Sequence, residues 1–166
     1  MFSASLTQLL STQTLAVSSR SKMTEKDFIG TWRLLSCEAQ LPDGEVKYLY
    51  GKNPIGMLVY EPSGHMCIMI MRRDRPNFSS DDPLGGNPEE IRSAYEGFDA
   101  YCGTYEIDTK GQIIIHHIEG SKFPNWVETD KVRFFELAED RLVLSTTPIM
   151  AGDEQWVVRS MWSRVG

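Results

Sequence analysis

The sequence predicts an all-β fold: an antiparallel up-and-down barrel of about eight to ten strands with one short helix. From Gly30 onward, short segments of strand character alternate with turn-forming residues at fairly regular spacing. Most of these segments are joined by tight turns, so consecutive strands are expected to pair in antiparallel fashion. A sheet this large would keep two exposed edges unless it closed on itself. Closure favours a barrel around one small internal cavity.

Three hairpins are the clearest of the predicted elements. Residues 57–61 and 65–72 flank the turn Pro62-Ser63-Gly64, and residues 101–108 and 112–119 flank Thr109-Lys110-Gly111. The third hairpin joins residues 131–138 to 141–147. The other strands are expected at residues 31–40, 46–50 and 155–165, with residues 148–154 as a loop.

One segment breaks the strand pattern and predicts a helix that runs to about Ala100. Asn87 can cap it, Pro88 suits its first position, and Glu90 completes a capping box. With the polar loop at residues 73–86, this helix could cover the barrel mouth or pack against its outside. Its apolar residues recur at helical spacing: Ile91, Ala94, Tyr95 and Phe98.

Length and charge limit the classes of partner. The 166 residues suggest one domain, and the net charge of −6 argues against nucleic acid and anionic membranes as partners. No apolar run reaches the roughly 18 residues that a membrane span needs. Three cysteines without a C-x-x-C pair indicate buried thiols in a reducing, cytoplasmic compartment: Cys37, Cys67 and Cys102.

The N-terminal residues differ from the rest of the chain. Residues 1–22 are rich in Ser and Thr and carry only two charges, Arg20 and Lys22. Their apolar residues are too interrupted for a secretory signal, whereas organelle targeting stays an alternative. We expect residues 1–26 to form a disordered leader and residues 27–166 to form the barrel domain.

Several stretches resemble a known family. Gly30-Thr31-Trp32 resembles the Gly-x-Trp motif of lipocalins, in which the Trp closes the barrel floor and an Arg of the last strand stacks on it. Arg159 and Arg164 are the candidates for that Arg. The longer stretches resemble the intracellular lipocalin-like domain family of bacteria and fungi over about residues 27–165. They are Tyr60-Glu61-Pro62-Ser63-Gly64, Met71-Arg72-Arg73-Asp74-Arg75-Pro76 and His116-His117-Ile118-Glu119-Gly120-Ser121.

This resemblance implies the fold and an interior pocket, and it does not imply one reaction. The chain departs from secreted lipocalins in two respects, because it lacks their signal peptide and their disulfide pattern. In addition, Lys131 replaces the Tyr expected after Thr129-Asp130 in the second lipocalin motif.

The candidate catalytic residues are His117 and Glu119. Neighbouring residues on a strand point to opposite faces, so only one of His116 and His117 can face the cavity. Because Glu119 shares its face with His117, we expect these two to form an acid–base pair in the cavity. The alternative is a hydrogen-bonded histidine within the wall. Two histidines on opposite faces cannot chelate one metal ion, so no metal site is expected.

Five further residues are candidates for ligand binding. Asn125 and Trp126 could form the rim of the pocket, although a loop whose aromatic residues seal the barrel end is the alternative. Arg72 ends a methionine-rich strand that would adapt to apolar ligands, or would simply be core. Tyr105 and Arg133 could anchor a carboxylate or a carbonyl, unless Arg133 lies on an exposed face.

Two functions remain open at this stage. The first is a cofactor-independent isomerase, cyclase or dehydratase that acts on a polyketide- or terpenoid-like compound of secondary metabolism. The second is a non-catalytic intracellular carrier or sensor of a small hydrophobic molecule. No phosphate loop, nucleophile elbow or haem motif is present, so no cofactor is expected. A His with a carboxylate in the cavity would favour the enzyme, and a purely apolar cavity would favour the carrier.

Overall fold

The computed structural model describes residues 23–166, and these residues are mostly strands. They contain one α-helix, α1 (Pro88–Glu96), and two 3-10 turns, η1 (Glu25–Asp27) and η2 (Pro124–Trp126). The strands are β1 (Gly30–Gln40), β2 (Val46–Tyr48), β3 (Ile55–Tyr60), β4 (His65–Met71), β5 (Phe98–Asp108), β6 (Ile113–Ser121), β7 (Asp130–Ala138), β8 (Arg141–Thr146), β9 (Ile149–Ala151) and β10 (Glu154–Arg164).

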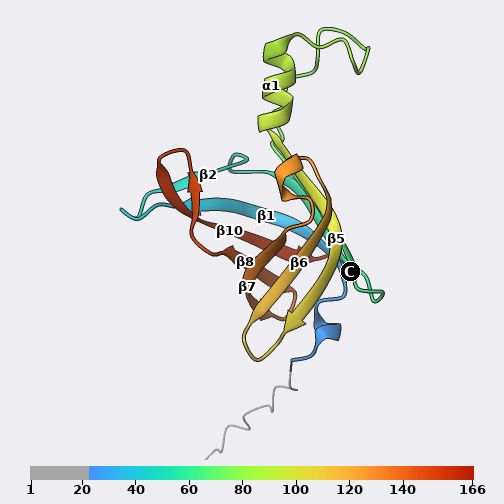
Figure 1. Cartoon of the computed structure of the whole chain (residues 1–166), viewed down its shortest axis with the longest axis vertical. Coiled ribbons are helices and arrows are strands. Elements are labelled where there is room, and N and C mark those ends of the chain that lie inside the picture. Colours follow the sequence, from blue (N-terminus) through green and yellow to red (C-terminus); the bar gives the residue numbers. More distant parts are fainter. Residues whose placement is uncertain (1–22) are drawn as a thin grey trace, which may run out of the picture.

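Eight of these strands form a closed antiparallel barrel, which confirms the predicted fold class (Figure 1). The order runs β1, β3, β4, β5, β6, β7, β8 and β10, and β10 pairs with β1 to close the sheet. The short strands β2 and β9 extend it beside β1 and β10. Strand β9 falls where a loop was expected, at residues 148–154, because Ile149–Ala151 pairs with the start of β10.

Strict alternation of side chains sets the inner face of the barrel. On β4, Met66, Ile68 and Ile70 are buried inside, whereas Cys67 and Met69 point outward. The methionine-rich stretch of β4 therefore does not form a methionine wall of the cavity. The closed end is filled by core residues that include Phe28, Trp32, Leu58, Tyr60, Phe135, Leu142 and Trp162.

Trp32 and Arg164 close one end of the barrel, as the sequence predicts. Trp32 is fully buried, and its Nε1 donates to the carbonyl of Phe28 at 2.9 Å. The guanidinium of Arg164 lies 4.2 Å from the centroid of the indole ring. Its Nη1 donates to the carbonyl of Ile29 at 2.9 Å, and its Nη2 donates to the carbonyl of Asp27. Arg159, the other candidate, lies on the surface beside Glu136.

The glycine of this motif is required by the same contact. Gly30 has a φ of +128°, in the region that side chains rarely adopt, and a Cβ there would lie 3.3 Å from Arg164 Nη1. The chain just before it also belongs to this closure. Met23 packs against the core, and the turn Glu25–Asp27 supplies the carbonyl that Arg164 binds. Of the predicted leader, residues 1–22 lie outside the described residues.

Replacing Arg164 by methionine should lower the free energy of unfolding by about 2 kcal/mol. The change removes a largely shielded cation–π contact and leaves two carbonyls without their donor. Urea denaturation at pH 7 measures the loss. Arg159→Met is the matched control and should change stability by less than about 0.5 kcal/mol, because its ion pair is exposed. Equal effects of the two variants would contradict the proposed closure.

The helix α1 begins as predicted but does not cover the barrel. Asn87 Oδ1 accepts from the backbone N of Glu89 and Glu90, and Glu90 Oε2 accepts from Asn87 N at 2.9 Å. The helix ends at Glu96 and not near Ala100, because Phe98 already pairs with Met71 in the sheet.

Helix α1 stands away from the barrel (Figure 1), and none of its residues is buried. Within residues 23–166, no helix is long and apolar enough to cross a membrane.

Candidate functional site: an interior cavity

The structure contains an interior cavity of about 420 Å³ at the end of the barrel opposite Trp32. This volume falls in the range of small-molecule pockets. Its wall is largely apolar and aromatic, with Trp126 and Trp156 among the residues that line it. Five side chains in the lining carry stronger polar or charged groups: Tyr50, Asp99, Tyr101, Lys131 and Arg133. An apolar cavity with a few convergent polar groups can both hold a ligand and orient it.

His116 lies beneath this cavity at the centre of a buried hydrogen-bonded chain. Its side chain is fully buried on the inner face of β6. Tyr60 Oη lies 2.7 Å from His116 Nε2, and Tyr101 Oη lies 3.0 Å from His116 Nδ1. Burial, with a smaller contribution from the positive charge of Arg133, lowers the pKa of His116 to about 3. The ring is therefore neutral at physiological pH, with one N–H donor and one acceptor nitrogen.

The hydrogen-bond partners of His116 indicate which of its two ring nitrogens carries the proton. Tyr60 is fully buried, and its hydroxyl is hydrogen-bonded to His116. If His116 Nε2 carried the proton, the Tyr60 hydroxyl hydrogen would be buried without an acceptor, which costs about 1–3 kcal/mol. In the arrangement that leaves no buried donor without an acceptor, the Tyr60 hydroxyl donates to His116 Nε2, and His116 Nδ1–H donates to Tyr101 Oη. The Tyr101 hydroxyl hydrogen is then free to donate into the cavity that Tyr101 lines.

Arg133 adds a second donor next to Tyr101. Its Nη2 lies 3.5 Å from Tyr101 Oη, and its Nη1 donates to the carbonyl of Val132 at 3.0 Å. Among the residues that the structure describes, no carboxylate forms a salt bridge with Arg133. Its remaining N–H groups are available to an acceptor in the cavity.

Lys131 shares the inner face of β7 with Arg133. The two residues pair with His116 and Ile114, which are both buried inside the barrel. The Lys131 ammonium lies 4.9 Å from the centroid of the Trp126 ring. Burial lowers the pKa of Lys131, and the nearby charge of Arg133 has the same effect. This wall of the cavity therefore favours a ligand atom that accepts hydrogen bonds.

Burial raises the pKa of the acidic groups that line the cavity, including Asp99 and Cys37. Burial raises the pKa of the Asp99 carboxyl, and the charge of Lys122 opposes that rise. Burial also raises the pKa of the Cys37 thiol to about 12, so this cysteine is not a nucleophile at neutral pH.

The predicted catalytic pair lies outside the barrel. His117 points outward, where its Nδ1 lies 2.7 Å from Asp130 Oδ1 and its Nε2 lies 3.7 Å from Glu106 Oε1. Glu119 is exposed on the same side. The expectation that His117 faces the cavity is therefore wrong, and His116 is the histidine on the inner face, buried beneath the cavity. The strand alternates as expected, but the isoleucines on both of its faces gave no signal for which face is inside.

A bulge lies next to these residues without exchanging their faces. The register of β5 and β6 shifts between Cys102 and Gly103, so that Glu119 is the extra residue of β6. Gly103 is required there, because a Cβ would lie 1.9 Å from the carbonyl oxygen of His117.

The structure brings two of the five predicted ligand-binding residues to the cavity, namely Trp126 and Arg133. The other three lie elsewhere. Arg72 forms an exposed ion pair with Asp74, Asn125 is exposed on η2, and Tyr105 Oη donates to the carbonyl of Glu61 at the closed end. Among the polar residues of the site, sequence reasoning missed Tyr50, Asp99, Tyr101 and Lys131 in the lining, and His116 beneath it. Alternation along β5 from Tyr105 would have found Tyr101 and Asp99.

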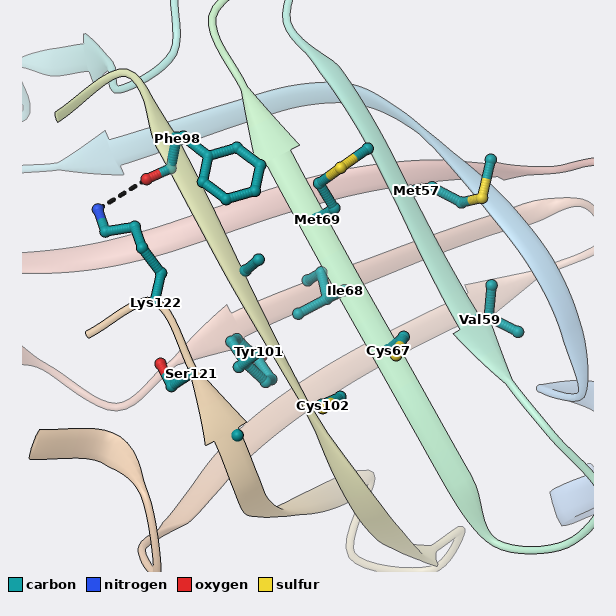
Figure 2. A pocket seen from close by; sticks show the side chains of 12 residues that line it. Met57, Val59, Cys67, Ile68, Met69, Phe98, Tyr101, Cys102, Ser121 and Lys122 are labelled. Carbon is teal, nitrogen blue, oxygen red and sulfur yellow. Dashed lines mark hydrogen bonds between the residues drawn. The ribbon is translucent and has the colours of Figure 1, made fainter. Parts of the chain in front are cut away.

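A second hollow, of about 480 Å³, lies on the outer face of β3, β4, β5 and β6 (Figure 2). Its lining is mainly apolar, the Tyr101 hydroxyl in it is bonded to His116, and Ser121 and Lys122 at its edge are hydrogen-bonded as well. Lys122 Nζ donates to the carbonyls of Tyr95 and Phe98, at 2.8 and 2.7 Å, and Ser121 Oγ accepts from Phe123 N. Among the described residues, Lys122 already uses two of its three N–H donors in this outer groove, whereas Arg133 and Lys131 converge in the interior cavity, so the interior cavity is the stronger candidate site.

A closed antiparallel barrel with an arginine-capped tryptophan at one end and a cavity inside defines a lipocalin-like protein. The chain belongs to the lipocalin-like domain family, whose model matches residues 29–165. It is 30% identical over 98 residues to the 4'-hydroxy-3'-methoxypropiophenone carrier protein of Aspergillus oryzae, a match that covers 54% of this chain and 88% of that protein. A solved lipocalin-like protein from Bacteroides uniformis is 14% identical, with a TM-score of 0.45 over 84% of this chain and 99% of that one.

Proposed function

We propose that the protein is a carrier that holds one small, mainly apolar molecule in the interior cavity by an acceptor oxygen of that molecule. The observation that carries this proposal is that Tyr101 Oη lies beside the guanidinium of Arg133 in the lining of a largely apolar cavity. An aryl ketone or a phenol matches this arrangement, because each combines a flat apolar body with an acceptor oxygen. The printed name of the Aspergillus oryzae relative, a propiophenone carrier, supports the same ligand class.

Binding without turnover fits the chemistry of the cavity better than catalysis does. His116 is neutral, and both of its ring nitrogens are engaged by tyrosine hydroxyls, so it cannot take a proton from a ligand. His117 and Glu119 lie on the outer face. Among the described residues, the cavity therefore does not hold the histidine–carboxylate pair that would favour an isomerase, cyclase or dehydratase.

One observation favours a catalytic alternative at the same site. Asp99 lines the cavity, and burial raises its pKa toward the range in which a carboxyl can both donate and accept a proton. Incubating the protein with candidate ligands and recovering them by mass spectrometry and chromatography separates the two functions. A carrier returns each compound unchanged. Formation of an isomer or a dehydrated product that stops in Asp99→Asn would establish catalysis instead.

Titration with 4'-hydroxy-3'-methoxypropiophenone tests the carrier proposal directly. Trp126 and Trp156 line the cavity, so their fluorescence should change in a saturable manner with one ligand per chain. The absence of saturable binding for this compound and for simpler aryl ketones would contradict the proposed ligand class.

Two matched substitutions locate the bound molecule. Val158→Phe places extra volume in the interior cavity, and Val59→Phe places the same side chain in the outer groove. We expect the first variant to weaken binding by about tenfold or more, and the second to leave the Kd within about twofold. The opposite pattern would move the site to the outer groove.

A further inference from the structure

Two of the three cysteines lie side by side on the outside of the barrel. Cys67 on β4 is directly opposite Cys102 on β5, and both belong to the lining of the outer groove. Figure 2 shows the two side chains on neighbouring strands at the groove. Cys67 is exposed and Cys102 is half-buried, so small reagents in solution can reach this pair.

The hydrogen bonds that flank this ladder show which kind of pair the two cysteines form. Tyr105 N donates to the carbonyl of Gly64, and Arg72 N donates to the carbonyl of Gly97, each at 2.9 Å. Hydrogen-bonded and non-hydrogen-bonded pairs alternate along an antiparallel ladder. Gly64 with Tyr105 and Arg72 with Gly97 are therefore hydrogen-bonded pairs, and every second pair between them is hydrogen-bonded too. Cys67 and Cys102 fall between two such pairs, so they form a non-hydrogen-bonded pair.

That position suits a covalent link between the strands. The Cα atoms of such a pair are about 4.5 Å apart, within the roughly 4.4–6.8 Å that disulfides span. The Cβ atoms of opposite residues are about 4.5–5.5 Å apart, a little more than the usual disulfide separation, so the bond would draw the strands together. A strained disulfide of this kind is readily reduced again.

The surroundings leave the two thiols free to react with each other. Gly120 of β6 lies opposite Cys102, and a Cβ there would sit 3.3 Å from Cys102 Sγ. The glycine therefore leaves one side of that sulfur uncovered. Burial and the neighbouring Cys102 thiol both raise the pKa of Cys67. Reaction through the Cys67 thiolate should accordingly speed up as the pH rises.

We propose that Cys67 and Cys102 form a reversible dithiol–disulfide site on the outer face of the barrel, oxidised by small disulfides such as oxidised glutathione. The exposed Cys67 loses its proton, and its thiolate attacks one glutathione sulfur, which forms a mixed disulfide and expels one glutathione thiolate. Cys102 then loses its proton and attacks the Cys67 sulfur, which expels the second glutathione thiolate. The two protons neutralise the two released thiolates, so the protein loses two hydrogens and one glutathione disulfide becomes two glutathione thiols.

Equilibrating the full chain in glutathione redox buffers, followed by acid quenching, alkylation and mass spectrometry, tests this site. We expect the oxidised protein to be a monomer that has lost two hydrogens, carries no glutathione, and yields a peptide that links Cys67 to Cys102. Excess reduced glutathione should restore both thiols. Cys37 is buried inside the barrel and should be alkylated only after unfolding.

Two variants sharpen the test. Cys102→Ser should stop at one glutathione per chain on Cys67, and Cys37→Ala should form the disulfide as the wild-type protein does. Three results in the wild-type protein would overturn the proposal. They are stable glutathione on Cys67, disulfide-linked dimers, and thiols that stay reduced in fully oxidised glutathione.

Discussion

Replacing His116 by phenylalanine should remove much of the acid sensitivity of the fold. Burial holds the pKa of His116 at about 3 in the folded protein, against 6.5 in the unfolded chain. Between these two values the unfolded state binds a proton that the folded state does not, so stability falls as the pH falls. The contribution is fully present above pH 6.5 and is lost by roughly 1.4 kcal/mol per pH unit down to about pH 3.

The same substitution should also lower the free energy of unfolding at pH 7, so its effect on stability should depend on pH in a characteristic way. Without the imidazole, the Tyr60 and Tyr101 hydroxyls lose their shared partner, which should cost about 2–5 kcal/mol at pH 7. Urea denaturation at pH 7, 5 and 4 should show this deficit shrinking as the pH falls. His65→Ala is the control, because His65 is exposed and bonded only to Ser63. A deficit that stays constant from pH 7 to pH 4 would mean that His116 is not held neutral.

Tyr101→Phe and Arg133→Met should each weaken ligand binding by about tenfold, and the double variant by more. Each removes one of the two donors that converge on the ligand oxygen, and a hydrogen bond to a well-placed acceptor contributes about 1–2 kcal/mol. Isothermal titration calorimetry with the propiophenone measures the loss. Tyr105→Phe is the matched control, because its hydroxyl binds the carbonyl of Glu61 away from the cavity, and its Kd should not change.

The ligand itself supplies a second control for this prediction. An analogue whose carbonyl is replaced by a methylene group, and which keeps no other acceptor oxygen, should bind the wild-type protein and Tyr101→Phe equally well. If Tyr101→Phe weakened both compounds to the same extent, the hydroxyl would act on the shape of the cavity and not as a donor.

Local sequence signals were enough to predict most of the fold. Turn chemistry located the three hairpins, and the Gly-x-Trp motif identified Trp32 with Arg159 or Arg164 as its partner, of which the structure has Arg164. The beginning of β5 was missed because Phe98 continues the helical spacing of Ile91, Ala94 and Tyr95. Only its pairing with Met71 across the sheet makes it a strand residue.

The site was harder to predict because closure of the barrel creates it. Tyr60 and His116 are 56 residues apart in sequence, and they meet because β3 and β6 face each other across the interior. Alternation correctly separated the faces of His116 and His117, but both faces of β6 are rich in isoleucine, so hydrophobicity did not mark the inner one. The carboxylate of Glu119 was the better signal, since a charged group without a partner favours solvent.

The structure of the complex with the propiophenone tests the central claim most directly. The account predicts that one ligand lies in the interior cavity, with an oxygen within hydrogen-bond distance of Tyr101 Oη and the Arg133 guanidinium, and with its ring against Trp126. A ligand found in the outer groove against Met57 and Met69, or one whose oxygens all point away from Tyr101 and Arg133, would contradict it.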